Sequence, residues 1–207
     1  RMERYLVPET SQLVPEGRLS LDDSVEQWQP GLIPGGAQIT VRQLLEHTTG
    51  LFNYTNDDAF ISGVVTDPLQ AYTPEQLITL ANSHPPLFPP GTSWSYSNTN
   101  YVLLSQLLGQ VTGTRAERYI TRNVIGRAGL RDTGFPAGPD IDGPHSRLYE
   151  AWFGMIDPPR DYSVYDMSWV GMAGALVSTM DDLNRFYRAL FTGRVIGKRA
   201  LAQMRGR

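Results

Sequence analysis

One stretch of the chain decides the fold: Pro90-Gly91-Thr92-Ser93-Trp94-Ser95-Tyr96-Ser97-Asn98-Thr99-Asn100-Tyr101. It leads from a proline- and glycine-rich turn into apolar residues that recur at helical spacing, namely Val102, Leu103, Leu104, Leu107, Leu108 and Val111. Gly113 is the kind of residue that ends such a helix. We therefore expect the phenol of Tyr96 and the amide of Asn98 at the start of a helix, held rigidly at the mouth of a pocket. The structural alternative is that Asn98 caps a helix beginning at Thr99.

A second signal lies upstream, in Thr40-Val41-Arg42-Gln43-Leu44-Leu45-Glu46-His47-Thr48-Thr49-Gly50-Leu51. Thr40 with Gln43 three residues later is a capping-box pattern. It predicts a helix that runs through His47 and stops at Gly50. We interpret His47 as a histidine favoured by the helix dipole. No Ser-His-acid order around it indicates a catalytic triad.

The rest of the chain also favours helices, separated by long loops. Thr73-Pro74-Glu75-Gln76 predicts a helix start, and Thr114 is expected to cap another helix with Glu117 at its third position. Further helices are expected after residues 176–179, at 198–204, and, interrupted by Pro8, at 3–14. Residues 129–167 should be irregular loops, and few segments alternate like strands. The predicted fold class is therefore mainly α, a single helical domain over residues 1–207.

The composition is that of an ordinary globular protein, and it excludes several kinds of function. Of 207 residues, 41% are hydrophobic and 19% are charged. A net charge of −3 gives no reason to expect nucleic acid or an anionic membrane as partner. No apolar run approaches the ~18 residues of a membrane span. With no cysteine and only three scattered histidines, neither a metal nor a cofactor is expected.

The basic residues are almost all arginine, because only one of the 18 is lysine. A GC-rich genome accounts for this bias, and the bias also has a chemical consequence. Lys198 is the only side-chain amine that could act as a base, and Val195, not a serine, stands three residues before it.

Four ordered segments resemble the class C β-lactamase and D-alanyl-D-alanine carboxypeptidase superfamily of serine hydrolases, most closely its soluble DD-peptidase branch. They are residues 13–23, the turn His47-Thr48-Thr49-Gly50-Leu51, the triplet Tyr96-Ser97-Asn98, and residues 173–183 after Trp169. A lone Tyr-Ser-Asn is a weak signal. Four segments in the family's order and spacing argue against coincidence.

The resemblance implies a two-part fold, with an all-helical domain inserted in an α/β domain and the active site between them. The family's nucleophile motif, Ser-x-x-Lys, occurs nowhere in these 207 residues, and Glu3 stands where its lysine would fall. The family's third motif, Lys- or His-Thr-Gly on a strand, is also missing. We therefore expect the helical domain of this fold, truncated at both ends, with most of the α/β sheet domain absent.

The resemblance also implies the roles of individual residues. Tyr96 would be the general acid/base, tuned by a neighbouring lysine, and Asn98 would bind the amide carbonyl of the substrate. A phenol without that lysine charge is a poor base at pH 7. The candidate substrate-binding residues are Ser97, Trp169, Phe52 and Tyr54. The aromatic members of this set could equally be core or loop packing.

Three hypotheses for function follow. The first is a truncated serine hydrolase whose parent activity is acyl-serine hydrolysis or transfer on D-Ala-D-Ala peptides, β-lactams or esters. The second is a repurposed domain that performs non-covalent acid/base or cyclisation chemistry on a small molecule. The third is a non-catalytic domain whose exposed face is covered by a second copy or a complementing domain. The location would be extracytoplasmic for a fragment of an exported parent, and cytoplasmic if Met2 is the native start.

Overall fold

The computed structural model describes residues 13, 14 and 16–204, and in this part of the chain the fold is mainly α. The helices are α2 Val25–Trp28, α3 Val41–Glu46, α4 Asp58–Thr66, α5 Pro74–Asn82, α6 Asn98–Thr112, α7 Ala116–Ile120, α8 Gly126–Ala128, α9 Met180–Phe191 and α10 Lys198–Met204. Short helical turns are η1 Gly36–Gln38, η2 Tyr54–Asn56, η3 Thr121–Ile125, η4 Trp152–Gly154 and η5 Gly171–Ala173. The one sheet of the described residues is a two-stranded antiparallel pair, β1 Tyr149–Glu150 and β2 Arg160–Asp161, with Tyr149 opposite Asp161.

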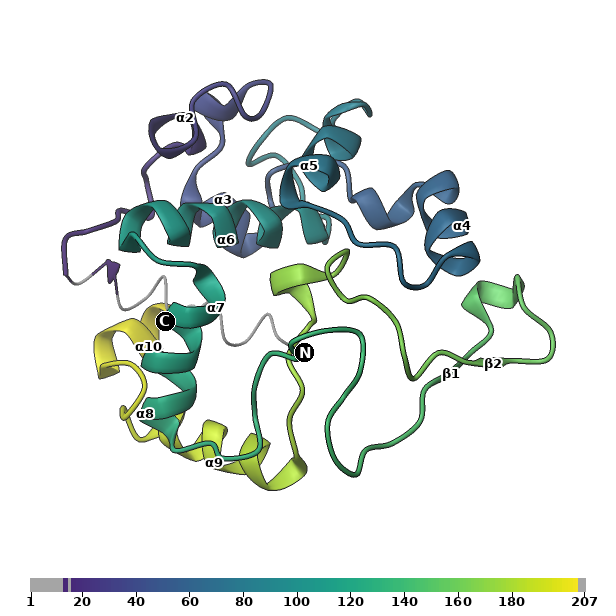
Figure 1. Ribbon diagram of the computed structural model, residues 1–207. Helices are drawn as coiled ribbons and strands as arrows, with labels where there is room; N and C mark the ends of the chain where they lie inside the picture. Colours follow the sequence, from purple (N-terminus) through teal and green to yellow (C-terminus); the bar gives the residue numbers. More distant parts are fainter. Residues whose placement is uncertain (1–12, 15, 205–207) are drawn as a thin grey trace.

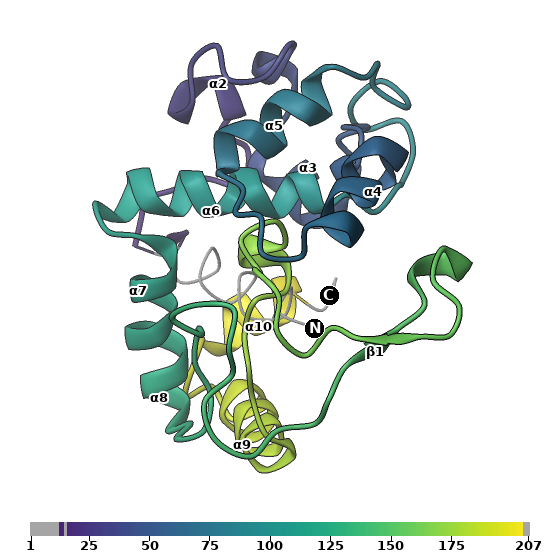
Figure 2. The same cartoon turned by 45° about the vertical axis from the view of Figure 1, so that its right-hand side comes forward.

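Helix α6 organises the molecule (Figure 1). Helices α3 and α5 pack along α6, and η5, which comes much later in the sequence, also contacts it. From its C-terminal end, α7, η3 and α8 form one continuous column, with α9 against α8 at the foot (Figure 2). The β1–β2 ribbon projects from this body at the end of a long irregular connection.

The N-terminal half of α6 is buried on nearly all sides, which explains its apolar sequence. Its buried apolar residues are Tyr101, Val102, Leu103, Leu104, Leu107 and Leu108. Burying each large apolar side chain contributes about 1.5–3 kcal/mol relative to leaving it exposed. The burial fixes the start of α6 in the core, and with it the Tyr96-Ser97-Asn98 triplet.

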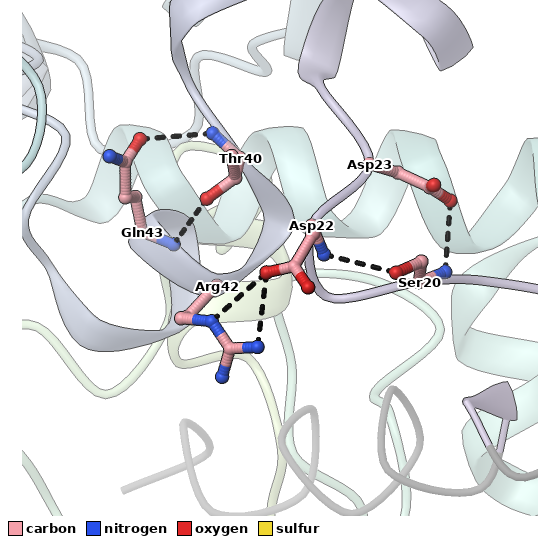
Figure 3. Close-up of polar contacts among 6 residues, drawn as sticks. All are labelled: Ser20, Asp22, Asp23, Thr40, Arg42 and Gln43. Atoms are coloured by element: carbon pink, nitrogen blue, oxygen red, sulfur yellow. Dashed lines mark hydrogen bonds and ion pairs between the residues drawn. The ribbon is translucent and has the colours of Figure 1, made fainter.

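The capping box expected at Thr40 and the helix start expected at Thr73 are confirmed. At the start of α3, the Thr40 hydroxyl accepts the Gln43 N–H at 3.2 Å, and the Gln43 side-chain oxygen accepts the Thr40 N–H at 3.0 Å. Figure 3 shows both bonds, together with Arg42 reaching Asp22 at 3.1 Å. The box fixes the point at which α3 begins, and therefore the register at which the chain arrives at the turn after it.

Three helix ends differ from the sequence-based expectation. Helix α3 ends one residue before His47, which is a left-handed C-cap at φ 58°. Asn98 is the first residue of α6 rather than its cap, because Ser97 holds the N-cap position. Helix α7 has Arg115 at its N-cap and no side-chain cap bond, so the expectation for Thr114 was wrong.

Other expectations from the sequence hold where the structure describes the chain. Residues 129–167 are irregular apart from β1, β2 and η4, and the last helix is α10. The short helix expected at 3–14 lies outside the described residues except for its last two positions. Across the described residues, no helix combines the length and the apolar character needed to cross a membrane.

Candidate functional site

The site is built on two segments that main-chain hydrogen bonds hold together. The turn after α3, residues 47–50, runs beside residues 87–95, which lead to the Tyr-Ser-Asn triplet. Three main-chain hydrogen bonds join them: Leu87 N–H to the Gly50 carbonyl at 2.8 Å, Gly91 N–H to the Thr48 carbonyl at 2.8 Å, and Ser95 N–H to the His47 carbonyl at 3.0 Å. These bonds fix the path of the main chain that leads to Tyr96.

Tyr96 and Asn98 lie side by side at the head of α6. The Tyr96 hydroxyl donates to Asn98 Oδ1 at 3.0 Å. Asn53 Oδ1 accepts from both the main-chain N–H and the Nδ2 of Asn98, at 3.0 and 3.2 Å. A third bond joins Asn98 Nδ2 to the Thr55 hydroxyl at 3.1 Å. Both amide hydrogens of Asn98 are thus directed to protein groups, and its oxygen holds the phenol.

His47 lies against the same phenol. Its ring stacks on Tyr96 with centroids 4.7 Å apart and planes 29° from parallel. Nδ1 accepts the Ser97 N–H at 3.2 Å and lies 3.0 Å from Asn100 Nδ2, while Nε2 lies 3.0 Å from the Tyr101 hydroxyl. These contacts give His47 a role that the helix-dipole interpretation does not include.

Residues 52–55 connect the triplet to Trp169. The Phe52 carbonyl accepts the hydroxyls of Thr99 at 2.7 Å and Ser97 at 3.3 Å. Two residues later, the Tyr54 hydroxyl donates to the Trp169 carbonyl at 2.7 Å. Burial raises the pKa of Tyr54 well above its ordinary value, so its phenol stays a neutral donor.

The six candidate residues therefore fall into two groups. Tyr96 and Asn98 come together and are partly accessible, and so are Phe52 and Trp169. In contrast, Ser97 is 1% exposed and Tyr54 is 0% exposed. These two were expected to contact substrate, but core packing turns both inward, where they hold the Phe52 and Trp169 main chain.

Two site residues were missed as candidates from the sequence, Asn53 and His47. His47 belongs to the family-like turn, so the resemblance itself carried a signal for it. Asn53 had no such signal, because its bonds reach 45 residues along the chain. Among the described residues, no group of three or more His, Cys, Asp or Glu side chains could hold a metal ion.

Asp57 supports Phe52 indirectly, through His84. Its carboxylate caps α4 by accepting the Phe60 N–H at 2.7 Å, and its second oxygen lies 2.9 Å from His84 Nε2. The His84 ring stacks on Phe52 with centroids 3.9 Å apart. The Phe60 N–H, aided by His84, holds the pKa of Asp57 below its ordinary value.

Replacing Asp57 with alanine should lower the free energy of unfolding by about 1 kcal/mol at neutral pH, because a helix N-cap is lost. A carboxyl whose pKa is lowered by folding stabilises the protein above its unfolded pKa of about 3.9, and this contribution fades as the pH falls through the folded value. Urea unfolding at pH 7 and pH 3 measures both effects. Asp57→Asn, which keeps a good cap without the charge, is the control. A gap between wild type and Asp57→Ala that stays constant to pH 3 would contradict the assignment.

The site and fold define a class of protein. The Beta-lactamase family profile matches residues 10–207, and the chain belongs to this family. It is 26% identical over 195 residues to the putative penicillin-binding protein PbpX of Bacillus subtilis, with 93% of this chain and 45% of that protein covered.

Solved structures give the same result. A D-stereospecific amidohydrolase from a Streptomyces species is 38% identical, with a TM-score of 0.93 over 98% of this chain and 62% of that one. The D-amino acid amidase of Ochrobactrum anthropi SV3, in complex with L-phenylalanine amide, is 25% identical, with a TM-score of 0.78 over 97% of this chain and 57% of that one. The chain thus spans about half the length of these relatives, between 45% and 62%.

Proposed function

We propose that this chain supplies the acid/base side of a serine hydrolase active site, with Tyr96 as the proton-transferring group. The observation that carries the proposal is the pair formed by the Tyr96 hydroxyl and Asn98 Oδ1, 3.0 Å apart at the head of a buried helix. Membership of the Beta-lactamase family supports it. Tyr96 is a partly exposed residue, which is consistent with a group that exchanges a proton with a substrate.

The reaction proposed is acyl transfer through an acyl-serine. A serine oxygen attacks the substrate carbonyl, the C–O bond forms, and the bond to the leaving nitrogen or oxygen breaks. The serine proton moves to the Tyr96 oxygen and from there to the leaving group, so Tyr96 ends as it began. Water then attacks the acyl carbon, its proton passes to the Tyr96 oxygen and on to the serine oxygen, the acyl–serine bond breaks, and the carboxylic acid is released.

Tyr96 needs help to act as the base. In this structure its hydroxyl donates to Asn98 Oδ1, and a hydrogen bond of this kind favours the neutral phenol. A cation close to the phenol would reverse that preference. No Ser-x-x-Lys is present in these 207 residues, so we propose that the serine and lysine lie in sequence of the protein beyond them. A sheet domain that carries the Lys- or His-Thr-Gly motif is proposed on the same grounds.

Asn98 is proposed to position the phenol first and to meet substrate second. Its Oδ1 holds the Tyr96 hydroxyl, and its Nδ2 hydrogens point to Asn53 and Thr55. A substrate carbonyl would take the place of the Thr55 hydroxyl as acceptor. Trp169 and Phe52, both partly accessible, are proposed as walls for the substrate.

The substrate class proposed is an acyl compound attacked at an amide or ester carbonyl: D-amino acid amides, D-Ala-D-Ala peptides, β-lactams or esters. The names of the similar proteins support this range, because they include a D-stereospecific amidohydrolase and a putative penicillin-binding protein. The amidohydrolase is the more similar of the two, at 38% identity. D-configured amides are therefore the first substrates to try.

Intact-protein mass spectrometry with a penicillin tests the proposal. The protein produced from its complete coding sequence should gain the mass of one penicillin. The 207-residue chain alone should gain none, because its sequence lacks the nucleophile motif. If the complete protein remains unmodified by penicillins and also fails to release ammonia from D-phenylalanine amide, the proposed function is wrong. In that case, non-covalent chemistry or a binding role becomes the function to test.

A further inference from the structure

We propose that His47 is a positioning residue for Tyr96: a neutral imidazole platform that fixes the plane of the phenol while Asn98 fixes its hydroxyl. The inference deepens the proposed function and rests on it for its kinetic consequence. Its structural content stands on the contacts of His47 alone.

The contacts of His47 assign the tautomer of the imidazole. A main-chain N–H can only donate, so the Ser97 N–H at 3.2 Å requires a lone pair on Nδ1. Asn100 is a second donor that shares this lone pair: its Oδ1 accepts the Thr49 hydroxyl at 2.9 Å, and its Nδ2 faces Nδ1 at 3.0 Å. The ring proton is therefore on Nε2, where it faces the Tyr101 hydroxyl at 3.0 Å.

The main chain of His47 is as constrained as its ring. The residue lies in the left-handed region, at φ 58° and ψ 38°, where residues other than glycine are uncommon. Its carbonyl accepts the Ser95 N–H at 3.0 Å, one residue before Tyr96. His47 is 7% exposed, so these bonds form away from water. The ring is consequently held at both its main-chain and side-chain ends.

The effect on Tyr96 follows from this arrangement. A phenol held only through its hydroxyl can still tilt about the axis from Cβ to oxygen. Stacking on the imidazole, with centroids 4.7 Å apart and planes 29° from parallel, removes that freedom. The same imidazole holds the N–H of Ser97, the next residue. His47 therefore sets the main chain and the side chain of the proton-transferring residue together.

Two substitutions separate the contributions of His47. His47→Asn suits the left-handed backbone, and its Oδ1 can take the place of Nδ1 as acceptor, but it has no ring to stack. His47→Phe keeps a ring and loses the acceptor. His145→Asn, on an exposed histidine in the 129–167 connection, is the matched control. Circular dichroism and thermal unfolding show which variants fold.

The kinetic test measures acylation of the complete protein by a penicillin. We expect His47→Asn to lower the acylation rate constant about 10–100-fold, since small displacements of a catalytic group cost up to about 100-fold. Non-covalent affinity and the control should be unchanged. In a Tyr96→Phe background, His47→Asn should cause no further loss. A wild-type rate for folded His47→Asn, alongside an impaired Tyr96→Phe, overturns the inference but leaves the proposed function intact. A wild-type rate for Tyr96→Phe instead removes both.

A second measurement does not require catalysis. In the wild-type protein, ¹⁵N NMR of His47 should show an unprotonated Nδ1 and a protonated Nε2. The two edges of the Tyr96 ring should give separate signals that merge in His47→Asn. A protonated Nδ1, or a Tyr96 ring that rotates freely in the wild type, contradicts the proposed platform whether or not the protein acylates.

Discussion

If Tyr96 transfers the proton as proposed, replacing it with phenylalanine should lower the rate of acyl-enzyme formation by about 10²–10⁴-fold in the complete protein, the range typical of a general acid/base. The substitution removes one oxygen and leaves the ring that stacks on His47. Asn98 Oδ1 loses one donor, on a residue that is partly exposed. The fold should therefore persist while the proton transfer fails, and time-resolved mass spectrometry of penicillin adducts measures the loss.

Tyr149→Phe is the matched control for that experiment. Tyr149 is a phenol on β1, on the ribbon that projects from the body, and it is 58% exposed. Its loss should leave the acylation rate unchanged. If Tyr96→Phe also acylates at the wild-type rate, Tyr96 does not carry the proton. The general base would then be another group.

Replacing Gly50 with alanine should have the largest effect on stability. Gly50 has φ +74°, and a Cβ built on it would lie 2.0 Å from the Phe88 carbonyl oxygen. The left-handed backbone costs a residue with a Cβ about 1–2 kcal/mol. Overpacking against a main chain adds about 1–3 kcal/mol. We expect the free energy of unfolding to fall by roughly 3 kcal/mol or more, as measured by urea denaturation.

The substitution Gly113→Ala separates the backbone cost at Gly50 from the cost of overpacking against Phe88. Gly113 closes α6 at φ +68°, and an added Cβ there meets no atom within 4 Å. It should show only the backbone cost. Equal losses at both positions would mean that the contact between Gly50 and Phe88 has no energetic consequence. Because the Gly50 carbonyl also accepts the Leu87 N–H, the alanine should in addition slow acylation in any variant that still folds.

The features read correctly from the sequence are those that depend on neighbours a few residues away. The capping box at Thr40 and the N-cap at Thr73 each depend on residues three positions apart, so the sequence alone predicts them. The apolar period of α6 and its closing Gly113 are local in the same sense. The placement of Tyr96 and Asn98 at the start of this helix is local as well.

The features that the sequence left open, or assigned only in part, depend on partners far along the chain. Asn98 fits the pattern of a cap, but its side chain bonds to Asn53 and Thr55, which lie 45 and 43 residues away. The bonds of His47 span 50 to 54 residues, and a local reading saw only a helix end. The burial of Ser97 and Tyr54 likewise depends on how distant segments pack, which hydrophobic pattern alone does not determine.

The hydrogen bonds between the His-Thr-Thr-Gly turn and the segment of the Tyr-Ser-Asn triplet matter for protein engineering. Grafting the triplet onto the start of another helix would transfer the residue types of the motif without their geometry. Residues 47–55 set the plane of the Tyr96 ring, the path of the main chain and the orientation of the Asn98 amide. A transplant would have to carry residues 47–55 and 87–100 as one cassette. Conversely, a change at His47 calls for a compensating change at Asn100, whose side chain faces Nδ1 of His47, so the two segments should be redesigned together.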